Sequence, residues 1–126
     1  MAEIKKKVLI VEDEKPLREI LKDKFKVSGF LTFGAKDGKE GLSIALKEHP
    51  DIILLDIIMP IMDGMTVLKK LREDPKGKNI PVILLTNLAD DQKVAEATEE
   101  GVYGYLVKSD WKIADVVKMV EERLGS

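Results

Sequence analysis

Five polar side chains directly follow short apolar runs of the chain, and their chemical types suit the binding of ions. They are Glu12, Asp13, Asp56, Thr86 and Lys108. The runs that precede them are 8–11, 52–55, 82–85 and 105–107. Such runs are typical of parallel strands, whose carboxyl ends meet at one edge of a sheet, so we expect these side chains to share one rim. Three carboxylates held close together repel one another unless some are protonated or a cation lies among them, which indicates a site for a hard metal ion.

Length and composition are those of one ordinary domain that folds without metals or disulfides. The chain has 126 residues, of which 44% are hydrophobic and 35% charged, and its net charge is -2 at pH 7. A domain of this size buries roughly 70% of the surface that its unfolded chain exposes. The near balance of acids and bases indicates no nucleic-acid surface, and we interpret the one basic cluster, Lys5–Lys7, as solvated.

The location of the protein is predicted from cysteine usage and from the start of the chain. Cysteine is absent, which excludes a disulfide scaffold and is typical of a reducing compartment. The apolar run 8–11 stops at Glu12 and is too short for a signal peptide or a membrane span. We therefore expect a cytoplasmic protein that does not insert into a membrane.

Apolar runs alternate with helical patterns along the whole chain, which predicts a β/α succession of strands and helices. The predicted strands cover 8–11, 30–35, 51–56, 82–85 and 103–107. The predicted helices cover 15–28, 38–48, a stretch from about 64, 90–100 and a stretch from about 113. The first of these helices should bury Leu17, Ile20, Leu21 and Phe25. Because 52–55 is apolar without interruption, we expect a central strand that helices cover on both faces.

One loop motif resembles a known family. The segment 56–64, Asp-Ile-Ile-Met-Pro-Ile-Met-Asp-Gly, is similar to the loop after the phosphoacceptor aspartate in receiver domains of two-component response regulators. The family's acidic pair, switch hydroxyl, aromatic switch position and lysine are matched by Glu12, Asp13, Thr86, Tyr105 and Lys108. The resemblance covers essentially the whole chain and implies a single receiver domain over 1–126, without an output domain. It implies an α/β fold with a doubly wound, flavodoxin-like, five-stranded parallel sheet of order 2-1-3-4-5 and five helices.

The resemblance also implies a reaction. Asp56 would be the nucleophile that accepts a phosphoryl group from a phosphohistidine or a small phosphodonor, giving an acyl phosphate. Lys108 and Thr86 would each bind a phosphoryl oxygen, and Thr86 would draw its loop inward so that Tyr105 can turn. The protein would be a phosphoacceptor with slow autophosphatase activity rather than a conventional enzyme.

The cofactor implied is Mg²⁺, because a carboxylate that attacks a phosphoryl group needs a neutralising cation. Mg²⁺ prefers octahedral oxygen coordination with one or two carboxylates and retained waters. Asp13, Asp56 and the backbone carbonyl of Ile58 could supply the ligands, with Glu12 acting through water.

The implied partners are proteins. A sensor histidine kinase or a histidine phosphotransfer protein would donate the phosphoryl group. A downstream target would bind the face formed by the fourth helix, the fifth strand and the fifth helix, with no direct nucleic-acid contact.

The chain departs from the family pattern at four positions near the site. Ser109 follows the lysine where proline is usual, and a cis bond without proline costs about 2.5–4 kcal/mol, so we predict a trans bond between Lys108 and Ser109. Asn87 is larger than the usual small residue and is expected to alter access of the phosphodonor. Ile58 and Leu88 are apolar where polar side chains can orient a hydrolytic water, which predicts slow autodephosphorylation.

Other functions are less consistent with the sequence. A degenerate receiver that only binds partners typically loses the acids or the lysine, and this chain keeps them. A flavodoxin needs a phosphate cradle where this chain has acids at 12–14, and neither the P-loop nor the dinucleotide-binding glycine motif occurs. His49 is interpreted as a surface residue rather than a phosphorelay histidine, and Trp111 either anchors a partner or covers the edge of the core.

Overall fold

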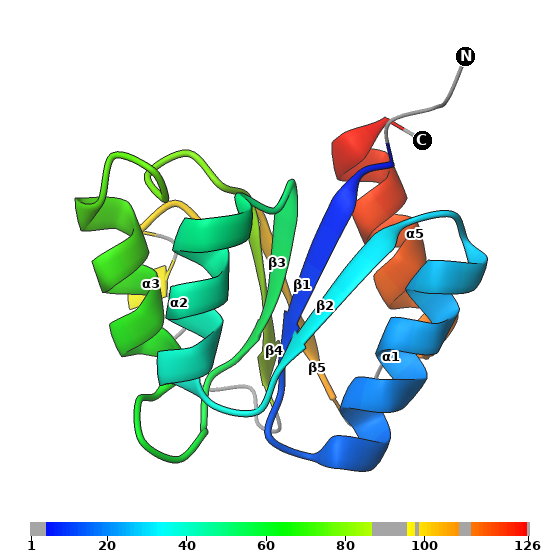
Figure 1. The fold of residues 1–126 in the computed structure, drawn as a ribbon, viewed down its shortest axis with the longest axis horizontal. Helices are drawn as coiled ribbons and strands as arrows, with labels where there is room; N and C mark the ends of the chain where they lie inside the picture. Colours follow the sequence, from blue (N-terminus) through cyan, green and yellow to red (C-terminus); the bar gives the residue numbers. More distant parts are fainter. Residues whose placement is uncertain (1–4, 87–95, 98, 109–111, 126) are drawn as a thin grey trace.

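The computed structural model describes residues 5–86, 96–97, 99–108 and 112–125, and a parallel sheet forms the centre of the molecule (Figure 1). Its strands are β1 Lys7–Val11, β2 Leu31–Ala35, β3 Ile52–Asp56, β4 Val82–Thr86 and β5 Gly104–Val107. They are hydrogen-bonded in the order β2-β1-β3-β4-β5, and every neighbouring pair is parallel. The predicted strand order is confirmed, and β1 and β3 flank the point where the order reverses.

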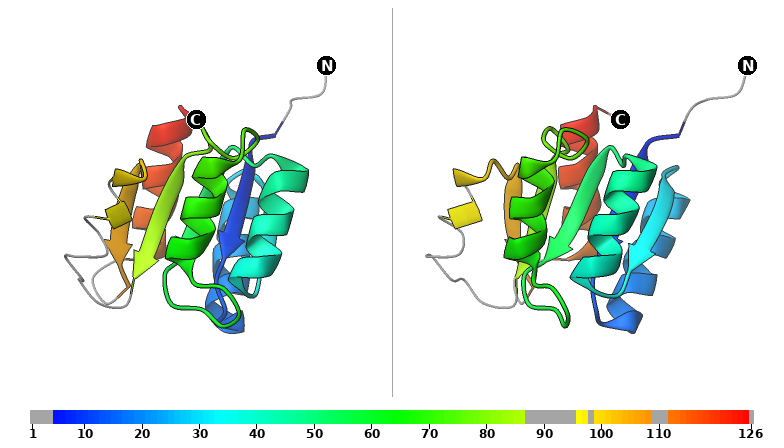
Figure 2. Two further views of the ribbon diagram at one scale, coloured as in Figure 1. Left: turned by 90° about the vertical axis from the view of Figure 1, so that its left-hand side faces the viewer. Right: turned by 60° about the vertical axis from the view of Figure 1, so that its left-hand side comes forward.

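Helices cover both faces of this sheet (Figure 2). The helices described are α1 Lys15–Val27, α2 Gly38–Glu48, α3 Gly64–Glu73 and α5 Ile113–Leu124. The helices α1 and α5 pack on one face, and α2 and α3 pack on the other. The helix predicted over 90–100 lies mostly outside the described residues, of which 96, 97 and 99 are helical, so the predicted count of five helices is not confirmed.

The sheet is doubly covered because the side chains of its central strands are apolar in both directions. In β1, Leu9 and Val11 belong to the core beneath α2 and α3, whereas Val8 and Ile10 belong to the core beneath α1 and α5. All residues of β3 and β4 are buried. This confirms the central strand predicted from the uninterrupted apolar run.

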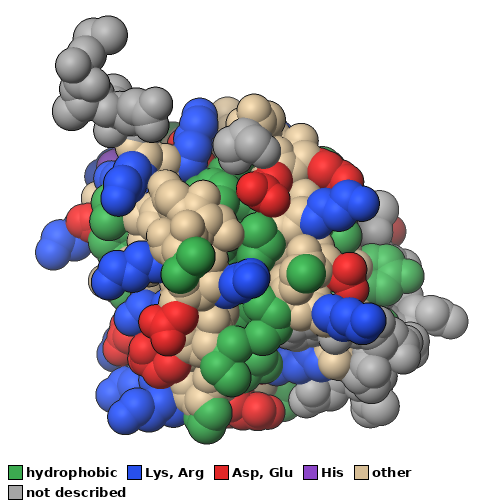
Figure 3. All heavy atoms as spheres, turned by 90° about the vertical axis from the view of Figure 1, so that its right-hand side faces the viewer, with side chains coloured by type: hydrophobic (Ala, Val, Ile, Leu, Met, Phe, Trp, Pro, Cys, Tyr) green, Lys and Arg blue, Asp and Glu red, His purple; other side chains and the backbone are tan. Residues whose placement is uncertain are grey.

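The helix α1 differs from its prediction in one residue of its apolar stripe. Leu21 and Phe25 are fully buried, but Ile20 is 49% exposed. Ile20 lies at the margin of the stripe, one helical step of about 100° from Leu21, and faces a groove between α1 and α5. Hydrophobic side chains are visible on this face of the molecule in Figure 3. The groove is lined by Ile20, Asp23, Lys24, Val27, Ile113 and Ala114.

The start of α3 lies against the end of β3. A Cβ on Gly64 would lie 2.2 Å from the backbone oxygen of Asp56, so only glycine allows this approach. The amide of Gly64 donates to the carbonyl of Ile57 at 2.7 Å, and the Asp63 carboxylate caps α3 by accepting from the amide of Thr66 at 2.8 Å. These contacts fix the backbone of Asp56 and Ile57 at the end of β3. None of the helices described is long and apolar enough to cross a membrane.

Candidate functional site

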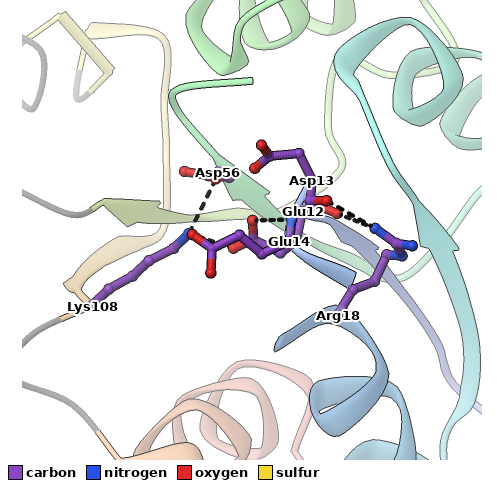
Figure 4. Close-up of polar contacts among 6 residues, drawn as sticks. All are labelled: Glu12, Asp13, Glu14, Arg18, Asp56 and Lys108. Carbon is purple, nitrogen blue, oxygen red and sulfur yellow. Dashed lines mark hydrogen bonds and ion pairs between the residues drawn. The ribbon is translucent and has the colours of Figure 1, made fainter. Parts of the chain in front are cut away.

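The three acidic residues of the predicted site converge at the carboxyl edge of the sheet. Glu12 and Asp13 follow β1, Asp56 ends β3, and the two strands are direct neighbours in the sheet. One carboxylate oxygen from each of the three residues lies within 4.8 Å of the others. Figure 4 shows these side chains together with Lys108 at the ends of their strands.

Lys108 reaches the acids from the outermost strand, β5, which lies two positions from β3 in the sheet. It follows β5, and its Nζ donates to the Glu12 carboxylate and, at 3.1 Å, to Oδ2 of Asp56 (Figure 4). The Lys108 side chain is 8% exposed, so these ion pairs are largely shielded from water. Its amide donates to the carbonyl of Thr86 at the end of β4, which holds the lysine to the neighbouring strand.

Burial dominates the electrostatics of the acids. Glu12 is fully buried, and burial raises its pKa from 4.5 to about 7, although hydrogen bonds from Lys108 and from the amide of Glu14 act in the opposite direction. Burial likewise raises the pKa of Asp56, against the charge of Lys108. For Lys108, burial alone would lower the pKa, but its bonds to the carboxylates of Glu12 and Asp56 outweigh burial and raise it. Burial thus disfavours the ionised forms of Glu12 and Asp56 more than Lys108 favours them.

The donor set fits a hard divalent cation. All ligand atoms offered by Glu12, Asp13 and Asp56 are carboxylate oxygens, which Mg²⁺ and Ca²⁺ prefer. Two of these acids are buried and one is exposed, so the cluster is open to solvent through Asp13. A cation among these oxygens would favour their ionised forms and offset the effect of burial.

The predicted switch residues lie beside the cluster. Thr86 is buried at the end of β4, where it pairs with Val107, the residue before Lys108. Tyr105 is 47% exposed on β5 and is not part of the cluster of acids. Exposed His49 ends α2 before β3 begins, at the opposite edge of the sheet, as expected of a surface residue.

Several predicted features fall outside the described residues. These are Asn87, Leu88, Ser109 and Trp111. The bond between Lys108 and Ser109 is therefore untested, while no cis peptide bond occurs in the part of the chain that the structure describes. Ile58 is described, and its side chain is 64% exposed beside the site.

One residue at the site was missed in the sequence. Arg18, on the first turns of α1, donates from Nη1 to the carbonyl of Glu12 at 2.8 Å and to that of Asp13 at 3.4 Å. Helical spacing could have indicated it, because Arg18 lies four residues after Glu14, the N-cap of α1. A side chain at that spacing points back toward the loop before the helix.

The family is decided by comparison with known proteins. The model of the response regulator receiver domain matches residues 8–121 of the chain. The chain belongs to this family.

Among curated relatives of this receiver domain, a probable transcriptional regulator ycf27 of Guillardia theta is 40% identical over 106 residues, which are 84% of the chain and 41% of the relative. The regulatory protein AtoC of Escherichia coli is 38% identical over 102 residues, 81% of the chain and 22% of the relative. The receiver domain thus spans less than half the length of these relatives.

Solved structures similar to this receiver domain include chemotaxis proteins. The protein CheY4 of Vibrio cholerae has a TM-score of 0.87 at 29% identity, covering 94% of this chain and 98% of that one. The CheY of Borrelia burgdorferi in a CheX-CheY-BeF3-Mg complex has a TM-score of 0.85 at 32% identity, covering 94% of this chain and 89% of that one. The likeness therefore extends over most of the chain.

Proposed function

We propose that this receiver domain accepts a phosphoryl group on Asp56 in a Mg²⁺-dependent reaction and thereby signals to a protein partner. The observation that carries the proposal is the grouping of Glu12, Asp13 and Asp56 within 4.8 Å, with Lys108 bonded to two of them. The CheY of Borrelia burgdorferi, similar over 94% of this chain, was solved with BeF3 and Mg. The partner-only alternative is not favoured, because that role would not require this grouping.

In the reaction, a carboxylate oxygen of Asp56 attacks the phosphorus of the donor. A bond forms between this oxygen and phosphorus, the bond to the donor's imidazole nitrogen breaks, and the electron pair leaves with the imidazole, which gains a proton. Asp56 is held for this attack by the end of β3 and by the close approach of Gly64. The nucleophile must be ionised, and the charge of Lys108 favours that form.

Asp13 and Asp56 would hold Mg²⁺ together with the backbone carbonyl of Ile58, and Glu12 would act through water. When bound, the ion would neutralise negative charge that accumulates on the phosphoryl oxygens. Lys108 would bind one phosphoryl oxygen from its position 3.1 Å from Oδ2 of Asp56. The hydroxyl of Thr86, at the end of the neighbouring strand β4, would donate to another.

The output would be a change on the face that includes β5 and α5. Thr86 and Tyr105 lie on paired strands, so a movement of the Thr86 loop would alter the space beside Tyr105. Tyr105 and Tyr103 are 47% and 45% exposed, and Arg123 of α5 lies over the Tyr103 ring at 5.8 Å. This aromatic and cationic surface would meet the downstream protein. A sensor histidine kinase or a histidine phosphotransfer protein would supply the phosphoryl group in the cytoplasm.

The test of phosphoacceptance is an intact mass measurement. The protein is incubated with acetyl phosphate and Mg²⁺, with and without EDTA, as wild type, as Asp56→Asn and as Glu14→Gln, which removes an exposed acid of the same edge. The proposal expects one added phosphoryl group in wild type and Glu14→Gln, and none in Asp56→Asn or with EDTA. An adduct that survives in Asp56→Asn contradicts the assignment of the nucleophile. Absence of any adduct and of any response to Mg²⁺ favours the partner-only function.

The lifetime of the phosphoryl group tests the autophosphatase part of the proposal. Ile58 is exposed and apolar beside the site, so it offers no hydrogen bond to an attacking water. Ile58→Asn adds such a group and should shorten the lifetime of phosphorylated protein after the donor is removed. A short lifetime in wild type that Ile58→Asn leaves unchanged would contradict this role of Ile58.

A further inference from the structure

The backbone carbonyls of the acidic loop are all bonded to one residue, Arg18, whereas the amide of Glu12 donates to the carbonyl of Ala35 and the amide of Glu14 to the Glu12 carboxylate. Residues 12–14 connect β1 to α1, and their three successive carbonyl groups all accept hydrogen bonds from Arg18. Nη1 donates to the carbonyls of Glu12 at 2.8 Å and Asp13 at 3.4 Å, and the amide of Arg18 donates to the carbonyl of Glu14 at 2.9 Å. Figure 4 shows the guanidinium beside the backbone of this loop and on the far side of it from Lys108.

The aliphatic part of the Arg18 side chain packs against the edge strand β2. A Cβ on Gly34 of β2 would lie 3.3 Å from Cδ of Arg18 and 2.9 Å from Cδ of Lys22. Because Gly34 has no side chain, both stems can cross β2 closely. Arg18 is thereby held between the edge strand and the loop, with its guanidinium directed at the carbonyls.

We propose that Arg18 is a positioning residue for the metal site, which sets the direction of the Asp13 carboxylate before the ion binds. The inference rests on the proposed function, because it concerns the same acids. Within the described residues no group donates a hydrogen bond to the exposed carboxylate of Asp13, so its direction depends on the loop backbone. The carbonyls of this backbone on both sides of the Asp13 side chain accept from Arg18. Outer partners that orient ligands commonly contribute 10–100-fold to metal affinity.

The direction in which Mg²⁺ affinity changes when the guanidinium is removed distinguishes a positioning role from an effect of charge alone. The guanidinium is a cation next to a cation site, so through its charge alone it weakens Mg²⁺ binding. Removing it should then tighten binding if charge is all that matters. If Arg18 positions the loop, removing it should weaken binding instead.

The experiment measures Mg²⁺ affinity by isothermal titration calorimetry, without phosphodonor, for the whole chain. Arg18→Met keeps much of the stem and removes the guanidinium. Arg18→Lys keeps the charge and loses the planar fork that reaches two carbonyls. Lys22→Met is the matched control, because Lys22 is a cation one turn further along α1 over the same glycine.

We expect Arg18→Met to weaken Mg²⁺ binding roughly tenfold, the lower end of the effect of outer partners. Arg18→Lys should weaken it in the same direction, and Lys22→Met should leave it unchanged or slightly tighter. Amide hydrogen exchange in the loop 12–14, measured in EDTA, should be faster in both Arg18 variants than in wild type. Because this exchange is measured without metal, it reports the order of the loop independently of its affinity for Mg²⁺.

Three outcomes overturn the inference. Binding by Arg18→Met that is unchanged or tighter means that the guanidinium acts through its charge, and an equal loss in Lys22→Met means that any cation on this face has the effect. If Arg18→Met does not fold, Arg18→Lys decides by the same criterion. If the Arg18 variants bind Mg²⁺ as tightly as wild type, this inference fails but the proposed function stands. If wild type binds no Mg²⁺, the proposed function fails as well.

Discussion

Glu12 should give the metal-free protein a pH dependence whose sign follows from its burial. Burial raises the pKa of this fully buried carboxyl from 4.5 to about 7, although Lys108 and the amide of Glu14 both bond to it. The folded protein therefore holds the Glu12 proton more tightly than the unfolded chain does, and protonation stabilises the folded state. This stabilisation is complete below about pH 4.5 and is lost as the pH rises through about 7.

The size of the effect follows from the same shift. One pKa unit corresponds to about 1.4 kcal/mol, so the rise from 4.5 to about 7 amounts to roughly 3 kcal/mol of unfolding free energy. Glu12→Gln has nearly the shape of the wild-type side chain and cannot ionise. The unfolding free energy of Glu12→Gln, relative to wild type, should therefore increase by roughly 3 kcal/mol between pH 4.5 and pH 8.

The assay is urea unfolding followed by far-ultraviolet circular dichroism in EDTA across this pH range. Glu14→Gln is the control, because it removes an exposed carboxylate from the same loop. Its stability relative to wild type should change by less than about 0.5 kcal/mol, as for most surface substitutions. Addition of Mg²⁺ should reduce the pH dependence of wild type, because a bound cation favours the ionised form of the acids.

This reasoning would be refuted if the unfolding free energy of Glu12→Gln, relative to wild type, stayed constant or decreased as the pH rises. Such a result would mean that the ion pair with Lys108 outweighs the burial of Glu12, so that the carboxylate is already ionised in the folded protein at low pH. Lys108 alone would then be enough to keep Glu12 ionised, and the electrostatic support for a divalent cation would be lost.

Three further substitutions test how the site is held. Lys108→Met should lower the unfolding free energy by about 3 kcal/mol at pH 8 in EDTA, because Glu12 and Asp56 lose their shared cation, and an unchanged urea midpoint would contradict this. Gly64→Ala should lower the unfolding free energy by about 2 kcal/mol, because its Cβ would lie 2.2 Å from the backbone oxygen of Asp56. If the variant is as stable as wild type and its amide resonances near Asp56 are unshifted, α3 adjusts freely to the added methyl group. Ile61→Asn should raise stability by about 1 kcal/mol in thermal unfolding, since Ile61 is β-branched at φ 70° and 76% exposed, and a lower melting temperature would mean that its side-chain contacts outweigh the strain.

Local sequence signals were sufficient to predict the elements that carry the site. The first helix was predicted over 15–28 and extends over Lys15–Val27, because Pro16 and Gly29 mark its ends clearly. The strand ends were predicted equally well, since an apolar run that stops at an acid or a hydroxyl is typical of a buried strand reaching the edge of a parallel sheet. The order of the strands was implied by the family resemblance and is confirmed.

Other features of the site depend on contacts between distant parts of the chain, and local patterns do not encode them. Lys108 bonds to Glu12 across 96 positions of sequence, and the balance between this bond and burial decides the pKa of the acid. The exposure of Ile20 depends on how α5 lies beside α1. The bonds of Arg18 to the loop depend on the absence of a side chain at Gly34 in a different strand.

Arg18 and Lys108 lie beside the acids but have different partners, and this difference supports the proposed binding of a further cation. Arg18 donates its hydrogen bonds to backbone carbonyls, so it orders the loop without pairing with a carboxylate. Among the described residues, Lys108 alone is paired with the buried acids Glu12 and Asp56, while Asp13 adds a further carboxylate within 4.8 Å. A phosphoryl group on Asp56 would increase the negative charge of this edge further. Under the proposed function, an ion with two positive charges and a preference for oxygen would be the addition that lets these residues act together on a phosphoryl group.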